Sequence, residues 1–253
     1  MRKQFMKSVV ALLLTICMII GNANVTFAAV ASQNSFIDPR INWLEEAADH
    51  VETVENGKLY TIDQLNAVFL VSPQEDGSIK LVVDEGSLHN VAVIDANYNI
   101  YLNGKKVEIV YDQTDISTEV VPKNVSGWSV KDTPSYGQPS EYTTYKGSGS
   151  TRDIALNQAL ATIGAGILAG IIAKHFKLSG TDCIKTATSI ISAFTSSYTT
   201  SLSCKTRITY HKDSAGGWKD GKYCEKHTTT WYEKKDYEGR TTVTANYHCR
   251  YLI

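Results

Sequence analysis

The sequence predicts an α+β fold built from two unlike parts. In residues 36–112 a short helical pattern precedes several β-branched segments, which predicts a small acidic antiparallel β domain with an N-terminal helix. Residues 154–173 have no formal charge and are rich in Ala and Gly, which predicts the first arm of an apolar helical hairpin. Residues 204–251 alternate polar, β-branched and aromatic side chains, which predicts a three-stranded antiparallel β meander.

Residues 1–31 are typical of a secretory signal peptide. The basic residues of this segment are Arg2, Lys3 and Lys7. An almost wholly apolar stretch follows from Ser8 to Ile20, and small residues end the segment at Ala29-Val30-Ala31. A retained membrane anchor is the alternative, but the apolar stretch is shorter than the ~20 residues that a spanning helix needs. We therefore expect cleavage after Ala31 and a secreted, extracellular protein.

The predicted acidic domain occupies residues 32–112. Asp38 is a suitable N-cap with Pro39 at the first helical position, and apolar residues at helical spacing continue until Gly57. The Asn103-Gly104 pair between two β segments predicts a hairpin, because both residues accept the positive φ angles of a tight turn. Residues 32–120 contain 16 acidic and 5 basic residues.

Residues 113–150 are rich in Ser, Thr, Gly and Pro and are predicted to be a connector. Ser150 and Asp153 have the spacing of a capping box, so we expect the apolar helix to begin there. A second helix is expected from about Asp182 to Tyr198. The two helices and the meander make residues 151–253 the basic C-terminal domain, because residues 121–253 contain 17 basic and 10 acidic residues.

The apolar helix has small residues at every fourth position, a spacing that lets helices approach closely within a membrane. These candidate membrane-active positions are Ala161, Ala165, Gly166, Ala169, Gly170 and Ala173. One interpretation is that the hairpin inserts into a target membrane or self-associates through this helix. The other is that the same helix is buried in the protein's own core, where Asn157, Gln158 and Thr162 cause no difficulty.

The cysteines of the expected mature chain are Cys183, Cys204, Cys224 and Cys249. An even number in an exported protein predicts two disulfides, and the sequence leaves all three pairings open. A one-residue register adjustment in the meander would bring Cys224 beside Cys249, which would leave Cys183 for Cys204. The spacing of Cys and His matches no common zinc finger, so no metal site is expected.

No catalytic motif is recognised in the chain. Metalloprotease, nucleophile-elbow and phosphate-loop patterns are all missing from the sequence, and the six histidines are scattered. We therefore expect no enzymatic activity, no catalytic residues and no cofactor. Export argues against a nucleic-acid partner, so the basic C-terminal half favours an anionic membrane or cell-wall polymer.

The signal peptide, the acidic N-terminal domain, the Ala/Gly-rich segment Ala155–Ala173 and the Cys- and Tyr-containing β tail together resemble the geobacillin-type large bacteriocins of bacilli. The resemblance implies a secreted antibacterial protein that acts on related Gram-positive bacteria through their membrane or an envelope receptor. It transfers no catalytic residue to this chain. A non-toxic secreted protein that binds the cell surface or wall is the alternative.

Overall fold

The computed structural model describes residues 38–116, 124–176, 178–194, 198–214 and 216–253. The predicted signal peptide, with Cys17, lies outside the described residues.

Seven consecutive strands form the first sheet, called sheet A here. Each strand pairs antiparallel with the strand before it, so sheet A is a meander in chain order. The strands are β1 (His50–Val54), β2 (Gly57–Ile62), β3 (Ala67–Pro73), β4 (Ile79–Glu85), β5 (Leu88–Ile94), β6 (Ile100–Leu102) and β7 (Lys105–Lys106). A 3-10 turn, Asp63–Leu65, links β2 to β3. In β4 the side chains of Ile79, Leu81 and Val83 are buried, because alternate residues of a strand share one face.

The second sheet, sheet B, is also antiparallel and seven-stranded. Its order is β8–β10–β11–β13–β14–β9, and β12 pairs with β13. The strands are β8 (Glu108–Ile116), β9 (Ser129–Lys131), β10 (Tyr142–Ala155), β11 (Ser201–His211), β12 (Trp218–Lys219), β13 (Lys222–Tyr232) and β14 (Thr241–Tyr251). Two 3-10 turns, Pro139–Glu141 and Lys235–Tyr237, precede β10 and β14.

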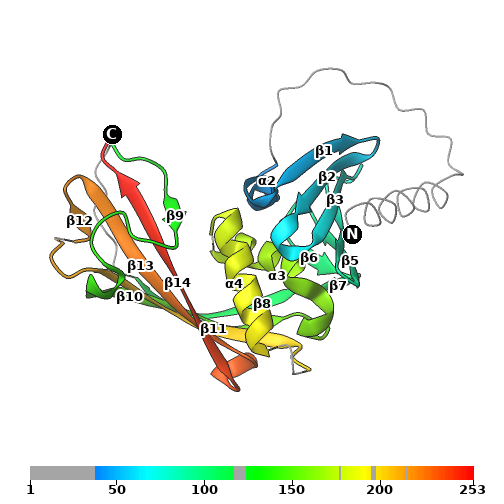
Figure 1. Cartoon of the computed structure of the whole chain (residues 1–253). Coiled ribbons are helices and arrows are strands. Elements are labelled where there is room, and N and C mark those ends of the chain that lie inside the picture. The colour runs from blue at the N-terminus through cyan, green and yellow to red at the C-terminus, as the bar shows by residue number, and fades with distance from the viewer. Residues whose placement is uncertain (1–37, 117–123, 177, 195–197, 215) are drawn as a thin grey trace, which may run out of the picture. The chain divides into compact units, whose positions relative to one another are not determined.

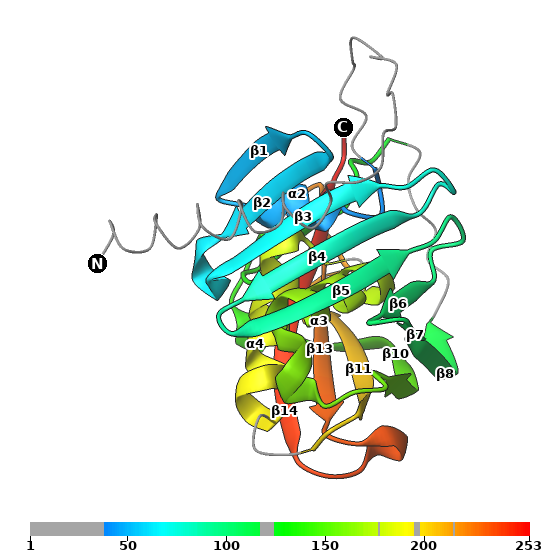
Figure 2. The ribbon, with the colours of Figure 1, turned by 90° about the vertical axis from the view of Figure 1, so that its right-hand side faces the viewer.

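Three α-helices occur in the described part of the chain: α2 (Asn42–Ala47), α3 (Leu160–Phe176) and α4 (Gly180–Phe194). Helices α3 and α4 lie between sheet A and sheet B (Figures 1 and 2). Gly164 interrupts α3 with a φ of 74°. The Glu85 carboxylate accepts hydrogen bonds from the backbone N–H groups of Ala165 at 2.9 Å and Gly166 at 2.8 Å. Sheet A thus supplies acceptors for the amides that open the long part of α3, which would otherwise lack partners.

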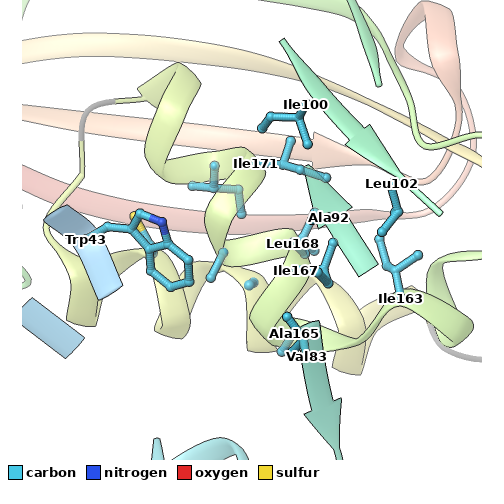
Figure 3. Close-up of a cluster of buried hydrophobic side chains, with 14 of the residues drawn as sticks. Trp43, Val83, Ala92, Ile100, Leu102, Ile163, Ala165, Ile167, Leu168 and Ile171 are labelled. Carbon is cyan, nitrogen blue, oxygen red and sulfur yellow. The ribbon is translucent and has the colours of Figure 1, made fainter. Parts of the chain in front are cut away.

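One hydrophobic core joins both sheets to the helices. In Figure 3, Ile163 of α3 lies beside Leu102, and Ile171 lies beside Ile100 of sheet A. On the other side, Phe176 of α3 packs edge-on against Trp231 of sheet B, with ring centroids 5.0 Å apart. Helices α3 and α4 therefore form a layer that packs against both sheets.

The predicted α+β fold class is wrong. The chain is mostly β, and its two main units are large antiparallel sheets rather than a small sheet and a three-stranded meander. Strands β11, β13 and β14 cover the predicted meander, but β8, β9, β10 and β12 extend it on both sides. The predicted apolar helical hairpin does not exist as a unit, because its two segments are short helices packed into the shared core.

The predicted helix start at Ser150–Asp153 is also wrong, because residues 142–155 form strand β10. This strand pairs with β8 on one edge and β11 on the other. Backbone pairing on both edges outweighs a local capping pattern and low β propensity. The predicted connector likewise contains the end of β8, all of β9 and half of β10; its residues 117–123 lie outside the described chain.

The N-terminal helix is shorter than expected, because α2 ends at Ala47 and β1 begins at His50. The predicted Asn103-Gly104 turn is confirmed. It joins β6 to β7, and both residues have positive φ, 47° and 81°.

Candidate functional site

Part of the face of sheet B that points away from the helices is basic, with exposed or half-exposed cations. We call it the basic face and define it by Lys205, Arg207 and Lys226 with the tyrosines beside them, Tyr145 and Tyr237. Side-chain alternation places Lys205 and Arg207 on one face of β11, because Cys204 and Ile208, which flank them in the strand, are buried. Lys226 of β13 is opposite Thr209, so it shares that face.

Cross-strand register sets the cations in successive rows. Lys205 pairs with Thr230, Arg207 with Thr228, and Lys226 with Thr209. Neighbouring rows on one face of a sheet are separated by two residues, or roughly 7 Å. Short threonine side chains lie opposite each cation. The Lys226 ammonium donates a hydrogen bond to the Pro139 carbonyl at 3.3 Å.

An aromatic ring lies beside each of the three cations, and the ring centroid of Tyr247 is 6.0 Å from the Lys226 ammonium. The Lys205 ammonium lies 4.1 Å from the ring centroid of Tyr237, and the Arg207 guanidinium lies 5.6 Å from that of Tyr145. Tyr145 is itself 50% exposed. Within the described residues, no carboxylate lies within 4.0 Å of the charged ends of Lys205, Arg207 or Lys226. Three cations without acidic partners give this face an attraction for polyanions.

The opposite face of β13 and β14 carries a buried polar cluster that the sequence did not reveal. Glu225 accepts a hydrogen bond from the Lys146 ammonium at 2.5 Å, and its other oxygen lies 3.1 Å from His227 Nε2. Burial alone would raise the pKa of Glu225. The hydrogen bonds and charges of His227 and Lys146 outweigh burial and lower that pKa to about 2. Glu225 is therefore a fixed negative charge inside the protein.

His248 stacks on His227 in this cluster, with ring centroids 3.9 Å apart. Burial is the main reason why the pKa of His248 falls to about 3. The sequence holds one signal for the cluster: Tyr223, Glu225 and His227 are alternate residues, so they share a face of one strand. That face looks solvated in the sequence, because nothing there shows that Lys146 covers it.

Five of the six small residues of α3 are buried or half-buried within this chain, and the sixth, Ala161, is exposed. Ala165, Gly166 and Ala169 are buried, and Gly170 and Ala173 are half-buried. A Cβ on Gly166 would lie 2.6 Å from the Phe69 ring, and one on Gly170 would lie 3.2 Å from the Trp43 ring. Because Gly166 and Gly170 have no Cβ, the rings of Phe69 and Trp43 can pack against α3 at these two positions. In the described chain, no helix is both long and apolar enough to cross a membrane.

One disulfide is present, between Cys224 and Cys249, which are directly opposite each other on β13 and β14. Tyr142 and Tyr247 are buried with this disulfide on the outer side of the sheet. Cys183 on α4 and Cys204 on β11 are free and buried, so the second suggested bridge is not formed. Burial raises the pKa of the Cys204 thiol to about 12, which keeps it protonated.

Among the described residues, no group of three or more His, Cys, Asp or Glu side chains is arranged to hold a metal ion.

Comparisons with protein-family models, with curated proteins and with solved structures find no match to this chain.

Proposed function

We propose that this is a secreted antibacterial protein that acts at the envelope of related Gram-positive bacteria, and that the basic face makes the contact. The observation that carries the proposal is the set of three exposed or half-exposed cations without acidic partners on one face of sheet B. The export signal predicted for residues 1–31 and the bacteriocin-like organisation of the sequence support the same function.

The envelope of Gram-positive bacteria offers polyanions to such a face. Each Lys or Arg near an anionic surface contributes ~1 kcal/mol. Three of them contribute about 3 kcal/mol, or roughly a hundredfold in local concentration. This is enough to hold the protein at an envelope and too little to bind it there permanently. The proposal therefore assigns the basic face to recognition and leaves the killing step to another part of the molecule.

Growth inhibition tests the proposal. Protein purified after expression of the whole 253-residue chain is applied to lawns of Gram-positive bacteria. The test variant carries Lys205→Gln, Arg207→Gln and Lys226→Gln. The control variant carries Lys80→Gln, Lys105→Gln and Lys106→Gln, which remove the same charge from exposed positions of sheet A. We expect clear zones from the wild type and the control, and zones at least several-fold weaker from the basic-face variant.

Two results would count against the proposal. Folded wild-type protein that clears no lawn would remove the antibacterial function, and retention on cells without killing would then favour the wall-binding alternative. Equal zones from all three proteins would remove the basic face from the contact.

A further inference from the structure

A cavity of about 370 Å³ lies between α2, the C-terminal end of α3, the turn that joins β5 to β6, and the residues around β9. We call it the α2–β9 cavity. Its volume falls in the range of small-molecule sites, which begins at ~300 Å³. The cavity is on the helix side of sheet B, so it is separate from the basic face.

Tyr98 provides one exposed aromatic wall of the α2–β9 cavity. Its side chain is 45% exposed, and its backbone has a φ of 64°, which is rare for a bulky residue. The Asp95 carboxylate holds this turn by accepting hydrogen bonds from the backbone N–H groups of Asn97 and Asn99, both at 2.8 Å. The Arg40 guanidinium lies 6.0 Å from the ring centroid. Backbone strain that is held this firmly is typical of ligand-binding positions.

Trp128, directly before β9, provides a second exposed wall. Its side chain is 47% exposed. The Arg250 guanidinium lies 4.3 Å from its ring centroid, and Tyr223 packs edge-on against it at 5.6 Å. The indole is therefore held in place by Arg250 and Tyr223, while about half of its surface remains exposed. Two exposed rings that are already held in place lower the entropic cost of binding.

Two hydrogen-bond donors of the cavity wall donate to no acceptor among the described residues. One is the indole N–H of Trp43, a residue only 6% exposed. The other is the ammonium of Lys174, whose pKa is lowered mainly by burial, although the charge of Asp95 acts in the opposite direction. Neighbouring polar groups are already used: Glu46 accepts from Asn42 and from the Gly180 backbone. The cavity thus presents unused donors, so its ligand should bring acceptors.

We propose that the α2–β9 cavity binds a pyranose sugar that carries an anionic group. The apolar C–H faces of the ring pack on Tyr98 and Trp128, and the carboxylate or phosphate accepts hydrogen bonds from Lys174 and Trp43. A simple acyl chain fits less well, because it would leave both donors without partners, at a cost for each buried group. This inference does not depend on the basic face or on killing.

Direct titration tests the proposal, with intrinsic tryptophan fluorescence as the readout and calorimetry as the check. The purified full chain is titrated with N-acetylmuramic acid, N-acetylglucosamine 1-phosphate and N-acetylglucosamine. The first supplies a carboxylate, the second a phosphate and the third no charge. We expect at least one anionic sugar to bind about tenfold more tightly than the neutral sugar, and the stronger of the two identifies the natural anion. A charged hydrogen bond contributes enough for this ratio.

Variants assign the binding to this cavity. Tyr98→Asn removes the ring while keeping a residue that tolerates positive φ, and it should weaken every sugar by about tenfold without unfolding the protein. Lys174→Gln should weaken only the anionic sugars, and Lys80→Gln, an exposed lysine of β4, should change nothing. The proposal is overturned if folded wild type binds none of the three sugars, or if Tyr98→Asn binds them as tightly as wild type. Sugar binding by a protein that kills no bacteria would support this inference and contradict the proposed function.

Discussion

The buried residues His248 and Glu225 make the free energy of unfolding depend on pH, His248 through burial and Glu225 through its hydrogen bonds and the charges of His227 and Lys146. The pKa of His248 is about 3 in the folded protein, far below the ~6.5 of an unfolded chain. The unfolded state therefore binds the proton first. Stability is fully present above pH 6.5 and is lost as the pH falls toward 3. Glu225 adds to the loss below about pH 4.5, because its folded pKa is about 2.

We therefore predict that lowering the pH from 7 to 4.5 costs about 2–3 kcal/mol of unfolding free energy through His248. Urea unfolding at pH 7, 5.5 and 4.5 measures this dependence. The variant His248→Gln should show a clearly shallower slope. The control His89→Gln changes an exposed histidine that is paired with Asp84 and should keep the full slope. Identical slopes for wild type and His248→Gln would contradict this explanation.

Gly166 illustrates a steric requirement at a single position. A Cβ there would lie 2.6 Å from the Phe69 ring, so the ring must shift. We predict that Gly166→Ala lowers stability by about 1–3 kcal/mol, the usual cost of overpacking a core. Ala161→Leu at an exposed position of the same helix should stay within ~0.5 kcal/mol of wild type. Thermal or urea unfolding of both variants checks this, and a Gly166→Ala protein as stable as wild type would refute the close packing.

At the scale of elements, the disulfide between Cys224 and Cys249 joins strands β13 and β14 of sheet B. The disulfide joins residues 25 positions apart, so it restricts the unfolded chain substantially. We predict that replacing both Cys224 and Cys249 by Ala costs about 3 kcal/mol of unfolding free energy. Thiol titration of the denatured, oxidised protein, after the expected cleavage has removed Cys17, should find two free thiols, from Cys183 and Cys204. Four free thiols would exclude the disulfide, and none would indicate a second bridge.

The sequence predicts those elements best where local chemistry decides the structure. The Asn103-Gly104 turn needs positive φ, and these residue types accept it. The prediction for the segment that forms β10 is wrong for the opposite reason. Its Ser, Gly and Thr residues favour a loop locally, and it is a strand only because it pairs with β8 and β11 on its two edges. Helix α3 was recognised as apolar, but its burial depends on Phe69 and Trp43, which are distant in the sequence.

The sequence likewise predicts only one part of the candidate site. The excess of basic residues in the C-terminal half is visible in the sequence, and it predicts a polyanion partner. The face that carries the cations follows only from the register of β11 and β13. The α2–β9 cavity could not be predicted at all, because Tyr98 lies in a turn of sheet A and Trp128 lies next to a strand of sheet B, far away in the sequence.

At the scale of the whole molecule, we propose that two surfaces have different tasks. On this proposal the basic face attracts polyanions through charge, which salt screens, and the α2–β9 cavity selects a small ligand through shape and two donors. The small residues of α3 belong to the core that joins the sheets. We therefore expect the protein to attach to bacterial cells through the basic face, and we expect salt to weaken this attachment.

Cosedimentation of the protein with intact Gram-positive cells, at low and at high salt, tests whether the basic face makes the contact with the envelope. The wild type and the control variant Lys80→Gln, Lys105→Gln, Lys106→Gln are compared with the variant Lys205→Gln, Arg207→Gln, Lys226→Gln. We predict that the first two pellet with cells at low salt and are released at high salt, because exposed charges are screened. The basic-face variant should pellet at least several-fold less than the wild type at low salt. Equal attachment of all three proteins, or attachment that high salt does not weaken, would contradict the account.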